Sequence, residues 1–334
     1  MRMRVLITGA TGFVGANLVE AVIQRGWQAR ALRRATSSLK ALEGLEYESA
    51  IGDVVDPESL VPAMRGVDVV FHVAAVADYW RAGKDLMYRA NVDGTRNVLE
   101  AARHGGVRRV VATSSVAALG LPPFGKTLDE TARFNLKAEQ FPYGHTKALA
   151  EDVVREFVAC GLDAVIVNPA VIIGPRDVNL ISGSLIVEAQ RIGVPFYPPG
   201  GVCVVDVADV CAGLIAAAER GRTGERYILG GENLWHRDML NVICDVVGRP
   251  RPKVALARGF TLALAGLVDV SRNGLRLKLP MNGGQVRFSA ETLWFDSAKA
   301  RHELGLVTRP FVESVRRTHE WYKANGYVAS IPRA

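Results

Sequence analysis

Short apolar runs alternate with amphipathic stretches along the first half of the chain. The amphipathic stretches repeat their apolar residues with a helical period, as at 14–25, 85–103 and 141–160. Pro57 directly after Asp56 is typical of a further helix start. The apolar runs are short and rich in β-branched residues, and they predict strands at 4–8, 28–32, 46–51, 67–73, 109–113 and 164–167. Nearly continuous apolar strands that alternate with helices predict an α/β fold, a doubly wound parallel sheet covered on both faces.

The second half of the chain is less regular. We place a domain boundary near Gly174 and Pro175. Residues 1–175 are predicted to form the sheet domain, with returning segments near 202–230, and residues 176–201 and 231–334 a smaller mixed α/β C-terminal domain. The pattern predicts strands at 201–205 and 225–229 and helices at 207–220, 235–247, 297–304 and 311–325.

Composition and charge limit the class of function. The chain has 334 residues, 49% hydrophobic and 22% charged, as in globular proteins. Its four cysteines form no C-x-x-C pair, so we expect no metal site and the reduced thiols of a cytoplasmic protein. The formal net charge of +7 lies entirely within 249–287, where eight Lys and Arg accompany one Asp. A basic segment so confined does not indicate nucleic-acid binding. It could bind an anionic ligand, contact a membrane surface or form a solvated face.

A glycine-rich loop follows the first predicted strand and opens the first helix. In Thr-Gly-Ala-Thr-Gly-Phe-Val-Gly (8–15), Gly9 permits a tight turn and Gly12 lets backbone N–H groups approach a pyrophosphate. Gly15 allows close packing of helix on strand, and the helix N-terminus favours phosphate. The loop therefore predicts a dinucleotide site whose first contacts are Gly9, Thr11, Gly12, Phe13 and Val14.

The end of the second predicted strand distinguishes NADP from NAD. NAD sites carry an acidic residue here, whereas this chain has Arg33 and Arg34 and no acid before Glu43. Guanidinium groups suit a 2′-phosphate, so we predict NADP (NADPH), held by Arg33, Arg34 and Lys40. The sheet domain is then an NADP-binding Rossmann domain, and the smaller domain binds substrate.

Two further segments carry candidate chemistry. Tyr143 and Lys147 stand four residues apart on a predicted helix and share a face, while Thr113, Ser114 and Ser115 end the fifth strand, at the edge where such sheets bind ligands. A phenol can protonate a developing alkoxide, and a nearby ammonium with oxidised nicotinamide would lower its pKa. A serine hydroxyl can orient the substrate oxygen, and Lys147 can also hold the nicotinamide ribose. This set predicts carbonyl reduction.

Together the motifs resemble the extended short-chain dehydrogenase/reductases over nearly the whole chain. Within that superfamily the chain is similar to the dihydroflavonol reductase-like branch of NAD-dependent epimerase/dehydratase family proteins. Residues 228–233 and 175–177 are typical of bacterial hopanoid-associated sugar epimerases in that branch. The matching motifs are T-G-A-T-G-F-V-G (8–15), G-D-V (52–54), H-V-A-A (72–75), N-V-D-G-T-R-N-V-L (91–99), T-S-S-V-A (113–117), Y-G-H-T-K (143–147), N-P-A (168–170) and G-P-R-D (174–177).

The resemblance implies roles for single residues. It implies Ser115, five residues before Gly120, as the catalytic serine, Tyr143 as the acid/base and Lys147 as its partner. Arg34 matches the position that binds the 2′-phosphate, and Asn91 is expected to brace the sheet. The remaining cofactor contacts, through the strand-end loops, the adenine cap and the nicotinamide wall, are Asp53, Val54, Ala74, Ala75, Thr113, Tyr143, Lys147, Pro169 and Ile172.

Three classes of function stay open, of which we favour an NADPH-dependent reductase of an apolar ketone or aldehyde. A nucleotide-sugar epimerase or dehydratase that recycles tightly bound NAD(P) is the alternative. Related 4,6-dehydratases carry an Asp-Glu pair where this chain has Val116 and Ala117, and related epimerases carry an Arg near 202–206, where this chain has none. A sensor without turnover is the third class, and such sensors usually lack the Tyr/Lys pair.

The substrate, the assembly and the location are also predicted. Tyr79, Trp80 and Tyr197 are expected to line the pocket beside Ser115, which suits a flat, aromatic or isoprenoid-like substrate. The apolar stretch 254–270, flanked by basic residues, predicts a helix, and a peripheral contact of residues 254–278 with the inner membrane stays open beside simple packing. We expect a cytoplasmic monomer or homodimer with a small-molecule substrate.

Overall fold

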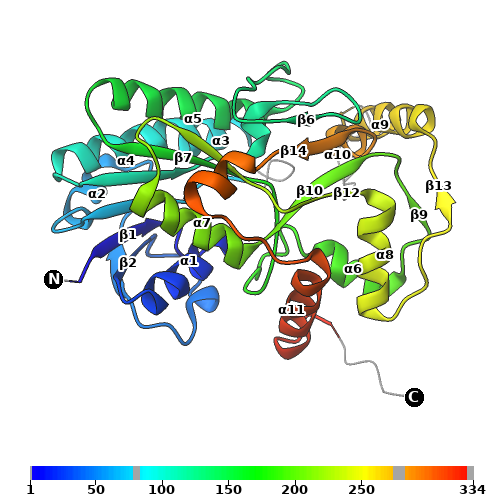
Figure 1. The fold of residues 1–334 in the computed structure, drawn as a ribbon, viewed down its shortest axis with the longest axis horizontal. Coiled ribbons are helices and arrows are strands. Elements are labelled where there is room, and N and C mark those ends of the chain that lie inside the picture. Colours follow the sequence, from blue (N-terminus) through cyan, green and yellow to red (C-terminus); the bar gives the residue numbers. More distant parts are fainter. Residues whose placement is uncertain (1, 78–82, 274–282, 329–334) are drawn as a thin grey trace.

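The computed structural model describes residues 2–77, 83–273 and 283–328, the side chains of 270–273 excepted. Its larger sheet has seven strands, all parallel, in the order β11-β7-β5-β4-β1-β2-β3 (Figure 1). The predicted α/β architecture with a Rossmann-like parallel sheet is therefore confirmed. The strands are β1 (Arg4–Thr8), β2 (Gln28–Arg33), β3 (Glu48–Ile51), β4 (Val69–His72), β5 (Arg109–Thr113), β7 (Ala164–Pro169) and β11 (Arg226–Leu229).

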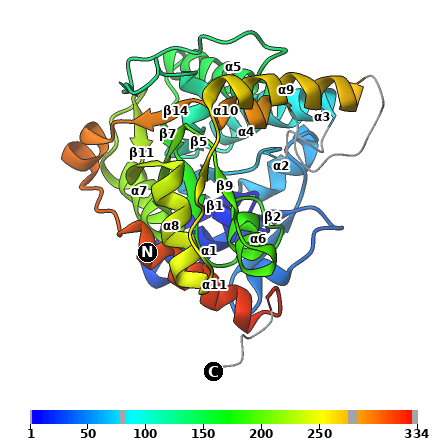
Figure 2. The same ribbon diagram turned by 90° about the vertical axis from the view of Figure 1, so that its right-hand side faces the viewer.

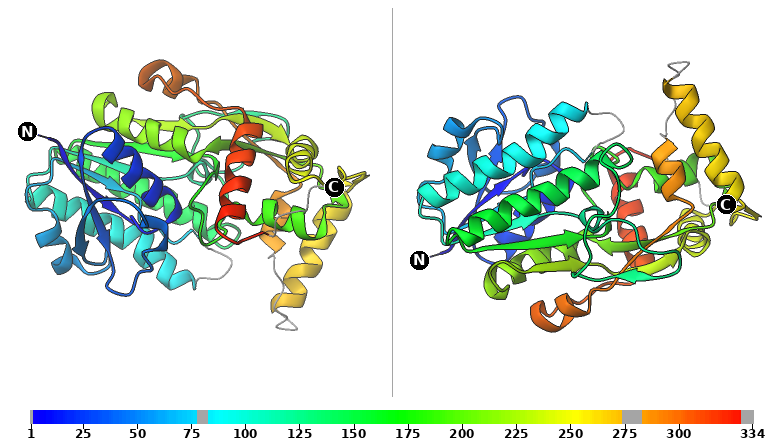
Figure 3. Two further views of the ribbon diagram at one scale, coloured as in Figure 1. Left: turned by 90° about the horizontal axis from the view of Figure 1, so that it is seen from below. Right: turned by 90° about the horizontal axis from the view of Figure 1, so that it is seen from above.

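Successive side chains of each strand enter different cores. Val5 and Ile7 of β1 join the core under one helical layer, and Leu6 joins the core under the other, as the period of two in a strand requires. The first layer holds α1 (Phe13–Gln24) and α7 (Val207–Arg220). The second holds α2 (Pro57–Ala63), α4 (Gly94–His104) and α5 (Pro142–Ala159), and Figure 3 shows α4 and α5 side by side over the sheet.

The helix expected at 85–103 is not regular. It consists of α3 (Lys84–Tyr88), a π-helical turn at Arg89–Asp93 and α4, without a break in the chain direction. A π turn inserts one extra residue into a helix and is frequent near functional sites. Asn91 lies in this turn and is buried.

A second unit lies beside the carboxyl end of the larger sheet (Figure 1). Its five-stranded sheet has the order β12-β10-β14-β6, with β8 paired to β10. A core between this sheet and three helices includes Val204, Ile243 and Val315. The strands are β6 (Thr127–Leu128), β8 (Val171–Ile173), β10 (Gly201–Asp206), β12 (Glu232–Trp235) and β14 (Thr292–Phe295), and the helices are α6 (Ser184–Ile192), α8 (His236–Val247) and α11 (Phe311–Ala324).

The far end of the second unit carries short elements. The strands β9 (Phe196–Tyr197) and β13 (Val254–Ala255) pair with each other, and α9 (Arg258–Asn273) packs on α10 (Gly283–Phe288) (Figure 2). The helix predicted from residue 254 therefore begins at Arg258, because residues 254–255 pair as a strand. The helix predicted over 297–304 consists of a π-helical turn at Ala300–Leu304.

Strands β10 and β11 lie in different sheets. β11 extends the larger sheet beside β7, whereas β10 lies at the centre of the second sheet. The chain thus returns to the first sheet after entering the second, so the two units are built from interleaved segments.

Candidate active site

The loop between β1 and α1 requires glycine at two positions. Gly9 has a φ of +66°, and a Cβ there would lie 2.7 Å from Ala74 Cα, on the loop after β4. A Cβ on Gly15 would lie 2.1 Å from the Gly9 carbonyl oxygen. The loop therefore passes tightly against the end of β4, and α1 packs directly on β1.

The same region fits a dinucleotide. α1 begins after Gly12 with no side chain capping it, so the N–H groups of Phe13 and Val14 at its start have no partner from the helix itself. At the end of β5, the buried Thr113 Oγ1 has no hydrogen-bond partner among the described residues. Donors at a helix start and an orphaned hydroxyl along one sheet edge suit the phosphate and ribose groups of a bound NAD(P).

The predicted 2′-phosphate residues differ in their surroundings. Arg33 Nε donates to Ser49 Oγ at 2.9 Å, which ties this guanidinium to β3. Lys40 Nζ lies 4.9 Å from the ring centroid of Tyr327. Arg34 is exposed at the carboxyl end of β2. Among the residues that the structure describes, Arg34 is thus the one of these three basic side chains that has no side-chain partner.

The predicted adenine residues form a short turn after β3. The carboxylate of Asp53 accepts the Val55 N–H at 3.1 Å, so part of its hydrogen-bonding capacity stabilises its own turn. Val54 is buried, and its carbonyl accepts Asn97 Nδ2 at 2.9 Å. α4 therefore holds the turn in place.

Ser115, Tyr143 and Lys147 meet at the carboxyl edge of β5. The hydroxyls of Tyr143 and Ser115 are hydrogen-bonded. One turn along α5, Lys147 is buried and its Nζ donates to the Thr113 carbonyl at 2.8 Å. The four-residue spacing on one helix thus brings both side chains to the end of a single strand, as the sequence predicts.

Burial controls the protonation of this group. It raises the pKa of the Tyr143 phenol, and the Ser115 hydrogen bond lowers that pKa only in part. The net direction is opposite to the lowering expected from a neighbouring ammonium. Burial also lowers the pKa of Lys147 to about 8, although the charge of Glu151 raises it. At neutral pH the phenol therefore carries its proton, ready to be donated.

Sequence reasoning missed Glu151, four residues beyond Lys147. This buried carboxylate accepts Ser114 Oγ at 2.7 Å and Asn168 Nδ2 at 2.6 Å on Oε1. Its Oε2 accepts guanidinium groups of Arg155 at 2.8 Å and Arg226 at 3.0 Å. Asn168 Nδ2 also donates to the Ser115 carbonyl at 2.9 Å, so Glu151 fixes the backbone that carries the candidate catalytic serine.

A second buried network supports the loop after β4. Asn91 accepts the Val76 N–H at 2.7 Å on Oδ1 and donates to Thr146 Oγ1 at 3.0 Å on α5. Asn91 therefore links this loop to the helix that carries Tyr143. The neighbouring His72 ring bonds to hydroxyls of Thr8 and Thr95, at 2.9 and 3.0 Å. Burial and the Lys147 charge lower the pKa of His72 to about 3, so it is neutral at pH 7.

The remaining predicted residues lie in several places. Tyr79 and Trp80 fall outside the described residues. Ala74 donates its N–H to Thr8 Oγ1 at 3.1 Å, and Ala75 is exposed. Pro169 is buried at the end of β7, and Ile172 pairs with Val205 in the second sheet. Tyr197 packs against the core of the second unit. Thr11 is half-buried in the glycine loop.

Two aromatic residues near Tyr143 were not predicted. The Phe141 ring centroid lies 6.1 Å from that of Tyr143 and 4.6 Å from that of Phe288 on α10. Phe288 is far away in sequence, so its approach to α5 was not readable from spacing. These rings give the candidate catalytic tyrosine an apolar neighbourhood on the side of the second unit.

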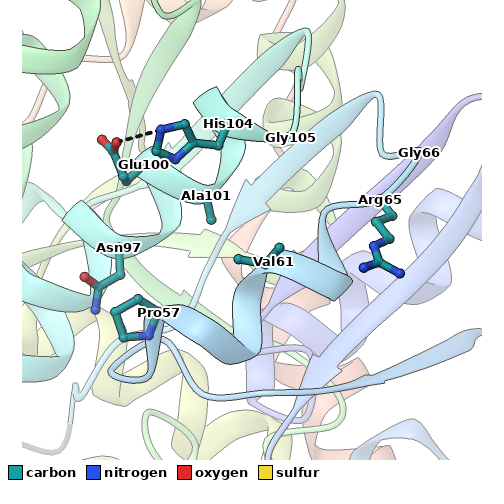
Figure 4. Close-up of a pocket in the computed structure, with 9 residues that line it drawn as sticks. All are labelled: Pro57, Val61, Arg65, Gly66, Asn97, Glu100, Ala101, His104 and Gly105. Carbon is teal, nitrogen blue, oxygen red and sulfur yellow. Dashed lines mark ion pairs between the residues drawn. The ribbon is translucent and has the colours of Figure 1, made fainter.

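Two hollows lie away from the candidate catalytic group. One, of about 510 Å³, lies between α2 and α4 and is lined by Asn97, Glu100 and His104 among others (Figure 4). The other, of about 500 Å³, is lined by Glu130, Glu151 and Arg226 among others. Neither is lined by Ser115, Tyr143 or Lys147. In the described part of the chain no three His, Cys, Asp or Glu side chains are grouped to hold a metal ion.

The fold and these contacts define a class of protein, the extended short-chain dehydrogenase/reductases, which bind a nicotinamide dinucleotide at this sheet edge. Residues 5–230 match the NAD dependent epimerase/dehydratase family. The chain belongs to this family, and its predicted membership is confirmed.

The chain is similar to known proteins over nearly its whole length. The chain is 36% identical over 329 residues to a Synechocystis protein named as a dihydroflavonol 4-reductase, and the alignment covers 96% of this chain and 95% of that protein. It is 35% identical over 330 residues to sterol demethylase protein B of Methylococcus capsulatus, covering 98% and 100%. Its fold matches a nucleoside-diphosphate-sugar epimerase from Pseudomonas aeruginosa with a TM-score of 0.82, at 26% identity and covering 98% and 100%.

Proposed function

We propose that the protein is an NADPH-dependent oxidoreductase that reduces a ketone or aldehyde of an apolar, aromatic or isoprenoid-like substrate. The observation that carries this proposal is the hydrogen-bonded pair of Ser115 and Tyr143 beside the buried Lys147. A protonated phenol next to a second hydroxyl is the arrangement needed to bind a carbonyl oxygen and protonate it.

Each candidate residue has a distinct part in this reaction. When bound, the reduced nicotinamide supplies a hydride to the carbonyl carbon. Ser115 donates a hydrogen bond to the carbonyl oxygen and stabilises the charge that develops there. Tyr143 gives its proton to that oxygen, which completes the alcohol. Lys147 holds the nicotinamide ribose, and its positive charge favours the phenolate left on Tyr143 until a proton is regained.

The preference for NADP rests on β2. Arg34 is exposed at the strand's carboxyl end, and no acidic residue follows before Glu43. We propose that Arg34 pairs with the 2′-phosphate, with Arg33 or Lys40 assisting. The glycine loop, Asp53, Val54, Ala74, Ala75, Thr113, Pro169 and Ile172 belong to the same proposed cofactor site.

The class of substrate is supported by the neighbourhood of Tyr143 and by relatives. Phe141 and Phe288 place aromatic rings near the phenol. The two sequence relatives described above carry names that refer to a dihydroflavonol and to a sterol, both flat polycyclic molecules. We infer that Tyr197, together with Tyr79 and Trp80, completes the apolar wall.

A nucleotide-sugar epimerase or dehydratase is the second candidate. It is favoured by the structural match to a nucleoside-diphosphate-sugar epimerase. Against it, β10 presents Val-Cys-Val-Val over 202–205, which offers no arginine for a diphosphate. An epimerase of this fold would need a cation from elsewhere.

The proposed assembly is a cytoplasmic monomer or homodimer, with a peripheral membrane contact through 254–278. Of that segment, residues 274–278 lie outside the described residues. No described helix is both long and apolar enough to cross a bilayer. Light scattering of the purified protein tests whether it is a monomer or a dimer.

The test of function is net cofactor consumption by the purified protein. Flavonoid, isoprenoid and steroid carbonyls would be presented beside UDP-sugars, with NADPH and with NADH. Sustained NADPH oxidation with a carbonyl, and weaker oxidation of NADH, supports the proposal. Interconversion of a sugar nucleotide without net consumption would contradict it and favour the epimerase.

A further inference from the structure

We propose that one end of the second unit docks on the surface of an anionic lipid bilayer. The surface, called here the docking face, comprises Phe260, Ala263 and Leu267 of α9 with Phe196 of β9 and Val254 of β13. The proposal deepens the peripheral contact named above. It rests on the proposed function only where it concerns delivery of a substrate.

The docking face exposes large apolar side chains. Phe260 is 58% exposed, Leu267 62%, Val254 57% and Phe196 50%. Residues 260, 263 and 267 follow the three- and four-residue spacing that places side chains on one side of a helix. The opposite side of α9 is anchored to the protein, since Thr261 and Ala265 are buried. α9 thus presents one apolar side outward while the other is packed.

The short elements that carry these side chains follow one another at one end of the second unit. β13 pairs with β9 through Val254 and Phe196. α9 begins three residues after β13 ends. Figure 1 shows β9, β13 and α9 at the end of the molecule away from the N-terminal sheet. The exposed residues therefore belong to neighbouring elements at one end of the molecule, and a concentration of exposed apolar residues is the feature expected of an interaction surface.

Charge identifies an anionic partner. Residues 249–287 contain eight Lys and Arg and one Asp, although Asp245 and Glu291, outside that range, pair with Arg251 and Arg258. Lys253 is exposed directly before Val254. Arg258, at the start of α9, remains 51% exposed although it pairs with Glu291 at 2.6 Å. Exposed apolar side chains beside basic ones are the combination that inserts into a headgroup region and attracts anionic lipids.

The docking face is connected to the candidate catalytic tyrosine. α9 packs on α10, and Phe288 of α10 contacts Phe141 with ring centroids 4.6 Å apart. Phe141 in turn lies 6.1 Å from Tyr143. A substrate that resides in the bilayer would thus meet aromatic side chains between α9 and the phenol.

Vesicle co-sedimentation tests the docking face. The full-length protein would be mixed at low salt with phosphatidylcholine vesicles, alone or containing phosphatidylglycerol. We expect binding to the mixed vesicles only, and weaker binding as salt is raised. The double variant Phe260→Glu/Leu267→Glu should lower the partition coefficient at least tenfold. Insertion of a single large apolar side chain into the bilayer raises that coefficient by about tenfold, and the variant loses two of them. Val307→Glu changes an apolar residue that is 81% exposed elsewhere and should bind like the wild type.

Three results would overturn the proposal. They are no binding of the wild type to phosphatidylglycerol vesicles at low salt, equal binding by the double variant, and a dimer in size-exclusion chromatography that the double variant alone converts to a monomer. The third would make the face a contact between two copies of the chain. Circular dichroism melting of the double variant establishes that it is folded. Because vesicle binding needs no turnover, it is read independently of whether the protein reduces a carbonyl.

Discussion

The catalytic edge of the larger sheet and the far end of the second unit depart from ordinary protein surfaces in opposite ways. At the catalytic edge, charged groups are buried, as Lys147 and Glu151 show with exposures of 5% and 2%. At the far end, large apolar groups such as Phe260 and Leu267 face outward. Burying a charge without partners and exposing a cluster of apolar side chains both cost free energy.

The difference separates two kinds of task. The buried charges have fixed partners on β5, β7 and β11, so they hold geometry. The exposed apolar groups have a free side, so they are available to a partner. Local rules of burial are broken at functional sites more often than elsewhere. We therefore expect substitutions at the catalytic edge to change the rate of turnover. Substitutions at the far end of the second unit should change how much of the protein binds to a membrane.

The largest effect is expected for Tyr143→Phe. The variant lacks the proton that the substrate oxygen receives, so kcat should fall by about a thousandfold, within the usual range for a general acid. Steady-state NADPH oxidation with the best carbonyl substrate measures it. Tyr327→Phe is the matched control, since its hydroxyl donates to the Val178 carbonyl, and it should keep its activity. Loss of less than tenfold in Tyr143→Phe would remove Tyr143 from its assigned role.

Glu151→Gln should lower kcat by roughly ten- to a hundredfold and change the KM for the carbonyl little. The amide weakens charge-assisted hydrogen bonds that hold Ser114 and Asn168, each of about 1.5–3 kcal/mol. The exposed neighbour Asp152→Asn is the control.

A pH profile separates positioning by Glu151 from general loss of structure. The Glu151 charge raises the pKa of Lys147, which is about 8. Wild-type activity should therefore decline as pH rises through about 8, and Glu151→Gln should decline at lower pH. An unchanged profile would contradict the link between Glu151 and Lys147.

A smaller effect is expected for Arg34→Ser. Loss of a charge-assisted pair with the 2′-phosphate should lower the preference for NADPH over NADH about tenfold. Arg33→Ser, which removes a side chain bonded to Ser49, should lower it less. The measurement is the ratio of kcat/KM with NADPH to kcat/KM with NADH. If this ratio is the same in the wild type and in Arg34→Ser, Arg34 does not bind the 2′-phosphate.

The smallest effect concerns stability at acid pH. The pKa of His72 is about 3 in the folded protein and about 6.5 when unfolded. The unfolded chain therefore binds the extra proton first, so stability is full above pH 6.5 and falls as pH decreases towards 3. At about pH 5.5 the loss is roughly 1 kcal/mol. Urea unfolding at about pH 7.5 and 5.5 should show a smaller loss in His72→Gln and an unchanged loss in the exposed His104→Gln.

Much of the larger sheet could be predicted because its information is local. The bounds of β1, β5 and α7 follow from apolar runs and helical periodicity, and the spacing of Tyr143 and Lys147 fixes their shared face. The π-helical turn at Arg89–Asp93 could not be predicted, because the contacts of Asn91 with Val76 and Thr146 arise only after folding.

The other contacts that the sequence did not predict also join residues far apart in the chain. Glu151 carries no motif of its own, and its role depends on Asn168 and Arg226 from two other strands. Lys40 contacts Tyr327 near the other end of the chain, which no local pattern indicates. Periodicity predicted the elements, whereas pairing of distant polar and aromatic groups completed the site.

The reaction itself is tested most directly by following the hydride. NADPH with deuterium at both C4 positions of the nicotinamide would be incubated with the protein and a carbonyl substrate, and the product analysed by mass spectrometry and NMR. Reduction predicts one deuterium on the carbinol carbon of a new alcohol and one NADP⁺ formed per product. A sugar nucleotide converted to its epimer, with no NADP⁺ accumulating and no deuterated alcohol from any carbonyl, would contradict the reductase.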